Sequence, residues 1–187
     1  MIKLFLITLL FIFIHISSHS HSGRTNYEGC HNKKSNNTYH CHNVEKKSSK
    51  DSYSGYAKVI DGDTIHIGNK KYRFSGIDAP EKNQFCILNE NKFNCGLLSK
   101  QILEDKINRN KVDCIEEDID RYKRILAECF VNGESLSSFL VKSGYAFAYI
   151  KYSKKFIEDE EFARHNNLGL WKTKFQFPWE FRKKNRN

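Results

Sequence analysis

The chain has 187 residues, six cysteines and a formal net charge of +9 at pH 7. A chain of this length can form one domain with a small appendage. The basic charge and the many aromatic residues suit a polyanionic partner, although a charged surface that serves only solubility would have the same composition.

Residues 1–20 are predicted to be a secretory signal peptide. Lys3 supplies a positive charge, residues 4–14 are apolar apart from one threonine, and Ser18 and Ser20 are small residues spaced for cleavage. The apolar run is shorter than the about 20 residues that a spanning helix needs, so an uncleaved anchor is the less favoured alternative. We therefore expect export to the periplasm or the medium, with no stable membrane insertion after cleavage.

Residues 21–54 form a polar segment that has too few aliphatic side chains to bury a core, and residues 43–54 of it are predicted to be a linker. The sequence GCHNKKSNNTYHCH resembles short Cys/His modules of exported bacterial proteins that contain YHCH. Its cysteines and histidines are Cys30, His31, His40, Cys41 and His42. One interpretation is a Cys30–Cys41 disulfide, which we favour slightly. The other is a Zn²⁺ site, because these are the side chains that zinc prefers.

The main domain is predicted to occupy residues 55–182, followed by a basic tail at 183–187. Its first part reads as a three-stranded meander, with strands at residues 56–60, 64–67 and 71–77. Asp-Gly and Gly-Asn pairs between these runs are typical of tight turns.

The second part of the domain alternates between helix and strand patterns. Apolar residues at helical spacing predict a helix over 96–109, and a hairpin follows with strands at 111–116 and 125–131. Further helices are expected around 136–140 and over 154–166. This order indicates an α+β fold, a five-stranded OB-type Greek-key β-barrel with about three packed helices.

Acidic and basic side chains gather where the meander turns. Asp63 ends the first turn and Asp78 follows the third strand, and two hard carboxylates suit Ca²⁺ or Mg²⁺. Glu81 could orient or deprotonate a water molecule. Arg73 and Arg124 offer the two guanidinium forks that a charged phosphodiester transition state needs. Each acid alone could be a solvated turn residue, but the combination favours a site.

The cysteines of the main domain form two local pairs. Cys114 and Cys129 lie symmetrically about the predicted hairpin turn, so they should be cross-strand neighbours. Cys86 and Cys95 bracket a polar loop that a disulfide could close. Buried free thiols are the alternative, but disulfides are the usual state in exported proteins.

Three motifs resemble the thermonuclease family of micrococcal or staphylococcal-type nucleases: IDGDT at residues 60–64, RFSGIDAPE at 73–81 and DRYKR at 120–124. The resemblance covers residues 55–182. It implies an OB-fold, Ca²⁺-dependent phosphodiesterase that acts on DNA and RNA and leaves 3′-phosphate ends. The matching positions are Asp63, Asp78 and the backbone carbonyl of Ala79 for one calcium ion, Arg73, Glu81 and Arg124 for catalysis, and Thr64, Tyr122 and Tyr149 for nucleic-acid binding.

Two residues depart from the family pattern. Ala79 replaces a threonine of the best-known member, and Lys123 stands where the motif has glycine. If that glycine needs a positive φ, lysine strains the turn that aims Arg124.

Two other functions are alternatives to a nuclease. One is a non-catalytic OB-fold module that binds nucleic acid or protein, and the other is an exported metal-handling protein built on the Cys/His segment. We expect a monomer.

The aromatic C-terminal tail is strongly basic. Its cationic side chains, which either contact phosphates or form a solvated surface, are Lys172, Lys174, Arg182, Lys183, Lys184 and Arg186.

Overall fold

A computed structural model describes residues 30–33, 38–41 and 51–185 of the chain, so the predicted signal peptide lies outside the described residues. The chain divides into two compact units, one ending at Lys46 and the other beginning at Lys47. No helix in the described ranges is long and apolar enough to cross a membrane.

The first unit contains one antiparallel hairpin, formed by β1 (Cys30–Lys33) and β2 (Thr38–Cys41). Its register places Cys30 opposite Cys41 and His31 opposite His40. These side chains and all of His42 lie outside the described part of the structure. The disulfide and zinc interpretations therefore both remain predictions.

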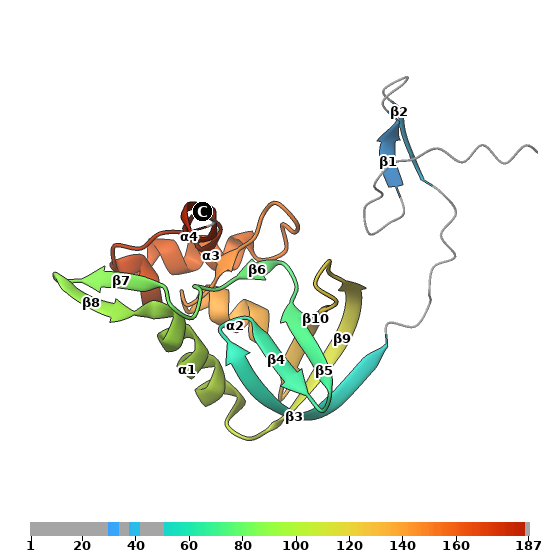
Figure 1. Cartoon of the computed structure of the whole chain (residues 1–187), viewed down its shortest axis with the longest axis horizontal. Helices are drawn as coiled ribbons and strands as arrows, with labels where there is room; N and C mark the ends of the chain where they lie inside the picture. Colours follow the sequence, from blue (N-terminus) through green and yellow to red (C-terminus); the bar gives the residue numbers. More distant parts are fainter. Residues whose placement is uncertain (1–29, 34–37, 42–50, 186–187) are drawn as a thin grey trace, which may run out of the picture. The chain divides into compact units, whose positions relative to one another are not determined.

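The second unit is built on a closed β-barrel of five strands (Figure 1). These are β3 (Ser52–Asp61), β4 (Thr64–Ile67), β5 (Lys70–Phe74), β9 (Lys111–Ile119) and β10 (Ile125–Val131). The hydrogen-bonded order is β10-β5-β4-β3-β9, and a further β9–β10 pairing closes the barrel. The β5–β10 pair is parallel and the other pairs are antiparallel. The predicted α+β fold with an OB-type barrel is confirmed.

Buried apolar side chains at every second position of the strands fill the barrel interior. Ile65 and Ile67 of β4 and Tyr72 and Phe74 of β5 are all buried, and the residues between them are less so. Successive strand side chains point to opposite faces, so this pattern leaves Arg73 on the face opposite the core. A Cys114–Cys129 disulfide joins β9 to β10, as the hairpin symmetry predicted.

Four α-helices accompany the barrel: α1 (Cys95–Ile107), α2 (Leu136–Lys142), α3 (Ile157–His165) and α4 (Pro178–Lys184). In Figure 1, α1, α3 and α4 lie to one side of the barrel strands. The side chain of Asn94 accepts a hydrogen bond from the Leu97 N–H and so caps α1. The sequence did not predict α4, which begins with proline at its first position, where the missing N–H costs nothing.

The predicted strand over residues 71–77 is wrong at its end. β5 stops at Phe74, and Gly76 turns the chain with a φ of 72°. A short strand, β6 (Ile77–Asp78), then leaves the barrel sheet and pairs with β12 (Phe147–Ala148). Glycine tolerates this left-handed conformation without steric cost. The turn carries Asp78 away from the barrel sheet.

The segment predicted as a polar loop is a hairpin, formed by β7 (Phe85–Leu88) and β8 (Asn91–Asn94). The predicted Cys86–Cys95 disulfide is present at its base. The remaining short elements are β11 (Glu134–Ser135) beside β10 and the 3₁₀ turn η1 (Gly169–Lys172).

A second cluster of buried residues lies outside the barrel. Phe147 forms its centre and is in ring contact with Trp171, Phe175, Phe177 and Trp179. Aromatic pairs of this kind add about 0.5–1.5 kcal/mol each beyond area burial. This cluster fixes the aromatic C-terminal segment against the domain.

Candidate active site

Asp63 lies at the β3–β4 turn, where the backbone passes close to Ala79. Gly62 makes this approach possible, because a Cβ there would lie 2.8 Å from the Cβ of Ala79. The buried Asp63 carboxylate accepts hydrogen bonds from Thr64 Oγ1 at 2.9 Å and from the Ala79 backbone N–H at 3.0 Å. Both of its oxygens therefore have fixed partners.

Arg73 joins the two aspartates that the sequence assigned to the cation. Its Nη1 donates to Asp63 Oδ1 at 2.6 Å and its Nη2 donates to Asp78 Oδ1 at 2.7 Å. The β4–β5 register places Arg73 opposite Thr64, which brings β5 alongside the Asp63 turn. Three predicted site residues from separate segments thus meet in one cluster.

Arg182 is a further member of the cluster, and the sequence did not assign it to the site. This side chain of α4 donates to Asp78 Oδ2 at 2.6 Å, to Asp78 Oδ1 at 3.0 Å and to Glu81 Oε1 at 2.6 Å. The sequence placed it in the basic tail, and no local pattern distinguishes it from the lysines that follow. Its partners lie 104 and 101 residues earlier in the chain.

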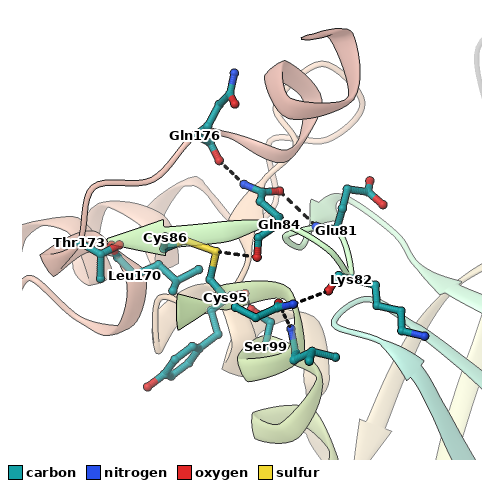
Figure 2. The surroundings of a disulfide bond; sticks show 12 residues. Glu81, Lys82, Gln84, Cys86, Cys95, Ser99, Leu170, Thr173 and Gln176 are labelled. Carbon is teal, nitrogen blue, oxygen red and sulfur yellow. Dashed lines mark hydrogen bonds between the residues drawn. A yellow bond between two sulfur atoms is a disulfide. The ribbon is translucent and has the colours of Figure 1, made fainter. Parts of the chain in front are cut away.

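Hydrogen bonds hold the segment that carries Glu81 in place, as Figure 2 shows. The backbone N–H of Glu81 donates to Gln84 Oε1 at 3.2 Å, and Gln84 Nε2 donates to the carbonyl of Gln176 at 2.6 Å. The backbone N–H of Cys95, which is bonded to Cys86, donates to the Gln84 carbonyl. The disulfide-linked hairpin and the C-terminal segment together position the Glu81 backbone.

Burial and charge shift the pKa values of the acids in different directions. Burial opposes ionisation of Asp63, but Arg73 and the hydrogen bonds from Ala79 and Thr64 outweigh it, so its pKa is lowered. Burial raises the pKa of Asp61 to about 6, with a further contribution from the neighbouring charge of Asp63. Burial also raises the pKa of Asp78, against the effect of its arginine partners.

The donor set suits a hard divalent cation. Asp61, Asp63, Asp78 and Glu81 carry four negative charges when ionised, whereas Arg73 and Arg182 supply only two positive ones. Oxygen donors with an excess of negative charge are what Ca²⁺ and Mg²⁺ require. Within the described ranges, however, no three His, Cys, Asp or Glu side chains are grouped closely enough to hold a metal ion as they stand.

Arg124 lies on the β9–β10 hairpin and is held by its own turn. Its Nε donates to Asp120 Oδ2 at 2.7 Å, while Asp120 Oδ1 accepts from the backbone N–H groups of Tyr122 and Arg124. Lys123 adopts a φ of 61°, the conformation that glycine would favour. Among the described contacts, none joins Arg124 to the carboxylate cluster. Its β10 strand does run beside β5, with Leu126 opposite Arg73.

The two predicted nucleic-acid-binding tyrosines have different surroundings. Tyr122 is 63% exposed at the hairpin tip, in cation–π contact with Arg124. Tyr149 is partly buried and stacks on Trp179 at 5.4 Å between ring centroids. Its backbone N–H donates to the Gly76 carbonyl at 2.9 Å, which places Tyr149 beside the turn that leads to Asp78.

Residues 71–173 match the family model described as staphylococcal nuclease homologue. This range includes Arg73, Asp78, Glu81 and Arg124, whereas Arg182 lies beyond its end.

Three relatives are similar over much of the chain. An uncharacterized endonuclease of Haemophilus influenzae is 35% identical over 61% of this chain and 63% of its own length. The succinoglycan biosynthesis protein ExoI of Rhizobium meliloti is 30% identical over 63% of this chain and 64% of its own length. A micrococcal nuclease of Shigella flexneri is 30% identical over 70% of this chain and 80% of its own length. The chain thus spans less than two thirds of the first two relatives.

Proposed function

The chain belongs to the staphylococcal nuclease family, and on that basis we propose that it is an exported, Ca²⁺-dependent nuclease. Its substrates would be the phosphodiester bonds of DNA, RNA or both, and its products would carry 3′-phosphate ends. The observation that carries the proposal is the convergence of Arg73 on both Asp63 and Asp78, with Glu81 linked to Asp78 through Arg182. Barrel strand, turn and C-terminal helix meet at these few side chains.

Each polar side chain has a distinct role in the proposed reaction. Asp63, Asp78 and the carbonyl of Ala79 would hold the cation, which when bound supplies Lewis-acid polarisation of the phosphoryl oxygen. Glu81 accepts a proton from the attacking water, or orients that water, while the water oxygen forms a bond to phosphorus. The bond to the 5′-oxygen breaks on the opposite side, and the leaving oxygen takes up a proton from solvent, which balances the one that the attacking water lost, to give a 5′-hydroxyl group.

The arginines stabilise the negative charge that builds on the phosphoryl oxygens. Arg73 is preorganised by its two aspartate partners, so its guanidinium loses little freedom when substrate arrives. Arg124 is likewise oriented by Asp120. Losing one transition-state donor of this kind typically costs about 10²–10³ in rate.

Two disulfides support the exported location, because such bonds persist mainly in oxidising compartments. The basic composition supports a polyanionic substrate.

The test is hydrolysis of DNA and RNA in activity gels, followed by steady-state kinetics on a short oligonucleotide across a Ca²⁺ titration. We expect activity with Ca²⁺ and none with a chelator. Arg73→Lys and Glu81→Gln should both lose most turnover, because lysine cannot form the two-point fork and glutamine cannot accept the proton. The matched controls are Arg109→Lys and Glu158→Gln, at exposed positions.

Wild-type turnover in both Arg73→Lys and Glu81→Gln would refute the site assignment. Binding of nucleic acid without any cleavage would instead support a non-catalytic OB-fold module.

A further inference from the structure

The C-terminal helix reaches the carboxylate cluster because the segment before it is firmly docked. Trp179 stacks on Tyr149 and on Phe177, at 5.4 Å and 4.6 Å between ring centroids. The Gln176 carbonyl accepts the hydrogen bond from the buried Gln84. These contacts do not involve Arg182, so α4 stays in place whether or not Arg182 is bound to the acids.

Arg182 occupies the oxygens that a cation would need. Asp78 is fully buried, and its Oδ1 accepts from both Arg73 and Arg182 while its Oδ2 accepts from Arg182. Glu81 Oε1 accepts from the same Nη1 of Arg182. A carboxylate oxygen offers two lone pairs, so Oδ1 of Asp78 has none left for a further ligand.

Arg73 and Arg182 differ in how readily they can leave. The Arg73 side chain is 15% exposed, comes from a barrel strand and is tied to both aspartates. The Arg182 side chain is 33% exposed and comes from the last helix of the described chain. Rotation of the Arg182 side chain can free Asp78 and Glu81 without disturbing the barrel, whereas loss of Arg73 would uncover two buried charges.

We propose that Arg182 is a displaceable countercharge: it neutralises Asp78 and Glu81 in the cation-free protein and gives up both carboxylates when a divalent cation binds. This inference rests on the proposed cation-dependent function and adds a competitor for the cation from the chain itself. A positive guanidinium and a cation would repel each other across the same oxygens, so binding of one disfavours the other. The arrangement also gives the buried Asp78 a second cationic partner, besides Arg73, before the cation arrives.

Calorimetric titration of Ca²⁺ into the purified full chain, without nucleic acid, tests the competition directly. We expect Arg182→Ala to bind Ca²⁺ about 5–150-fold more tightly than wild type, the usual range for coupling between two sites. Lys183→Ala is the matched control, because it removes one positive charge from the neighbouring exposed position of α4. It should change the affinity by less than about twofold, since exposed charges are screened.

Thermal unfolding with and without Ca²⁺ gives a second readout. Without Ca²⁺, Arg182→Ala should unfold at a lower temperature than wild type, because Asp78 loses a partner. Ca²⁺ should raise the melting temperature of the variant more than that of wild type.

Equal or weaker Ca²⁺ affinity in Arg182→Ala, with normal binding by wild type, would overturn the inference and leave the proposed function intact. Absence of Ca²⁺ binding in all three proteins, with cleavage persisting in chelator, would refute the proposed cation dependence itself.

Discussion

Replacing Gly96 with alanine should displace Glu81 and slow the proposed cleavage, while the protein loses some stability but still folds. A Cβ at Gly96 would lie 1.9 Å from the carbonyl oxygen of Glu81 and 2.6 Å from its carbonyl carbon. Non-bonded carbon contacts are best at about 3.5–4.0 Å, so the Glu81 backbone must move by more than about 1 Å. A misplacement of this size can cost about 10²-fold in rate, and overpacking costs about 1–3 kcal/mol of stability.

The assay is steady-state cleavage of a short oligonucleotide, combined with urea denaturation. We expect kcat to fall about 10²-fold while KM changes little, because the role proposed for Glu81 lies in the transition state. Gly133→Ala is the control, since Gly133 has a φ of 80° and no atom within 4 Å of an added Cβ. It should lose stability through backbone strain and keep its turnover. A folded Gly96→Ala protein with wild-type kcat would refute the argument that this contact positions Glu81.

Three further predictions concern stability. Replacing Cys114 and Cys129 together with serine should lower the free energy of unfolding in urea by about 3 kcal/mol, since the bond closes a loop with a sequence separation of 15; an unchanged urea midpoint would contradict this. Burial raises the folded-state pKa of Glu160, so its ionisation costs stability as the pH rises from about 4.5 through that pKa. Glu160→Gln should therefore melt at a higher temperature than wild type at pH 7 but not at pH 4, and a gap of equal size at both values would contradict it. Lys123→Gly should raise the free energy of unfolding by up to about 1 kcal/mol by removing left-handed strain, and destabilisation in the same urea assay would count against strain at this turn.

The barrel and the Asp63–Arg73–Asp78 part of the site follow from the sequence because their signals are local. Period-2 alternation marks β4 and β5, and turn residues separate the strands. The carboxylates and Arg73 lie within 16 residues of one another, so their meeting needs only a turn and one strand pairing.

The errors fall where tertiary packing decides. The predicted third strand runs too far because Ile77 continues the apolar pattern, although Gly76 allows the chain to leave the sheet. The β7–β8 hairpin reads as a loop because each strand has only four residues and β8 is mostly polar, and its disulfide and packing stabilise it. The intrinsic β-strand propensity of such short segments is a weak signal, so tertiary contacts decide their structure.

Arg182 could not be assigned from the sequence because its role depends on where α4 docks. That docking comes from ring contacts around Phe147 and Trp179, which carry no periodic signal. The consequence is energetic as well as geometric. Arg73 is shared between Asp63 and Asp78, so without Arg182 a fully buried carboxylate would have half of one guanidinium as its countercharge. Leaving a buried charge without its partner typically costs about 3–5 kcal/mol. The last helix therefore stabilises the same acids that a cation would stabilise, and this equivalence is the physical basis for exchange between the two.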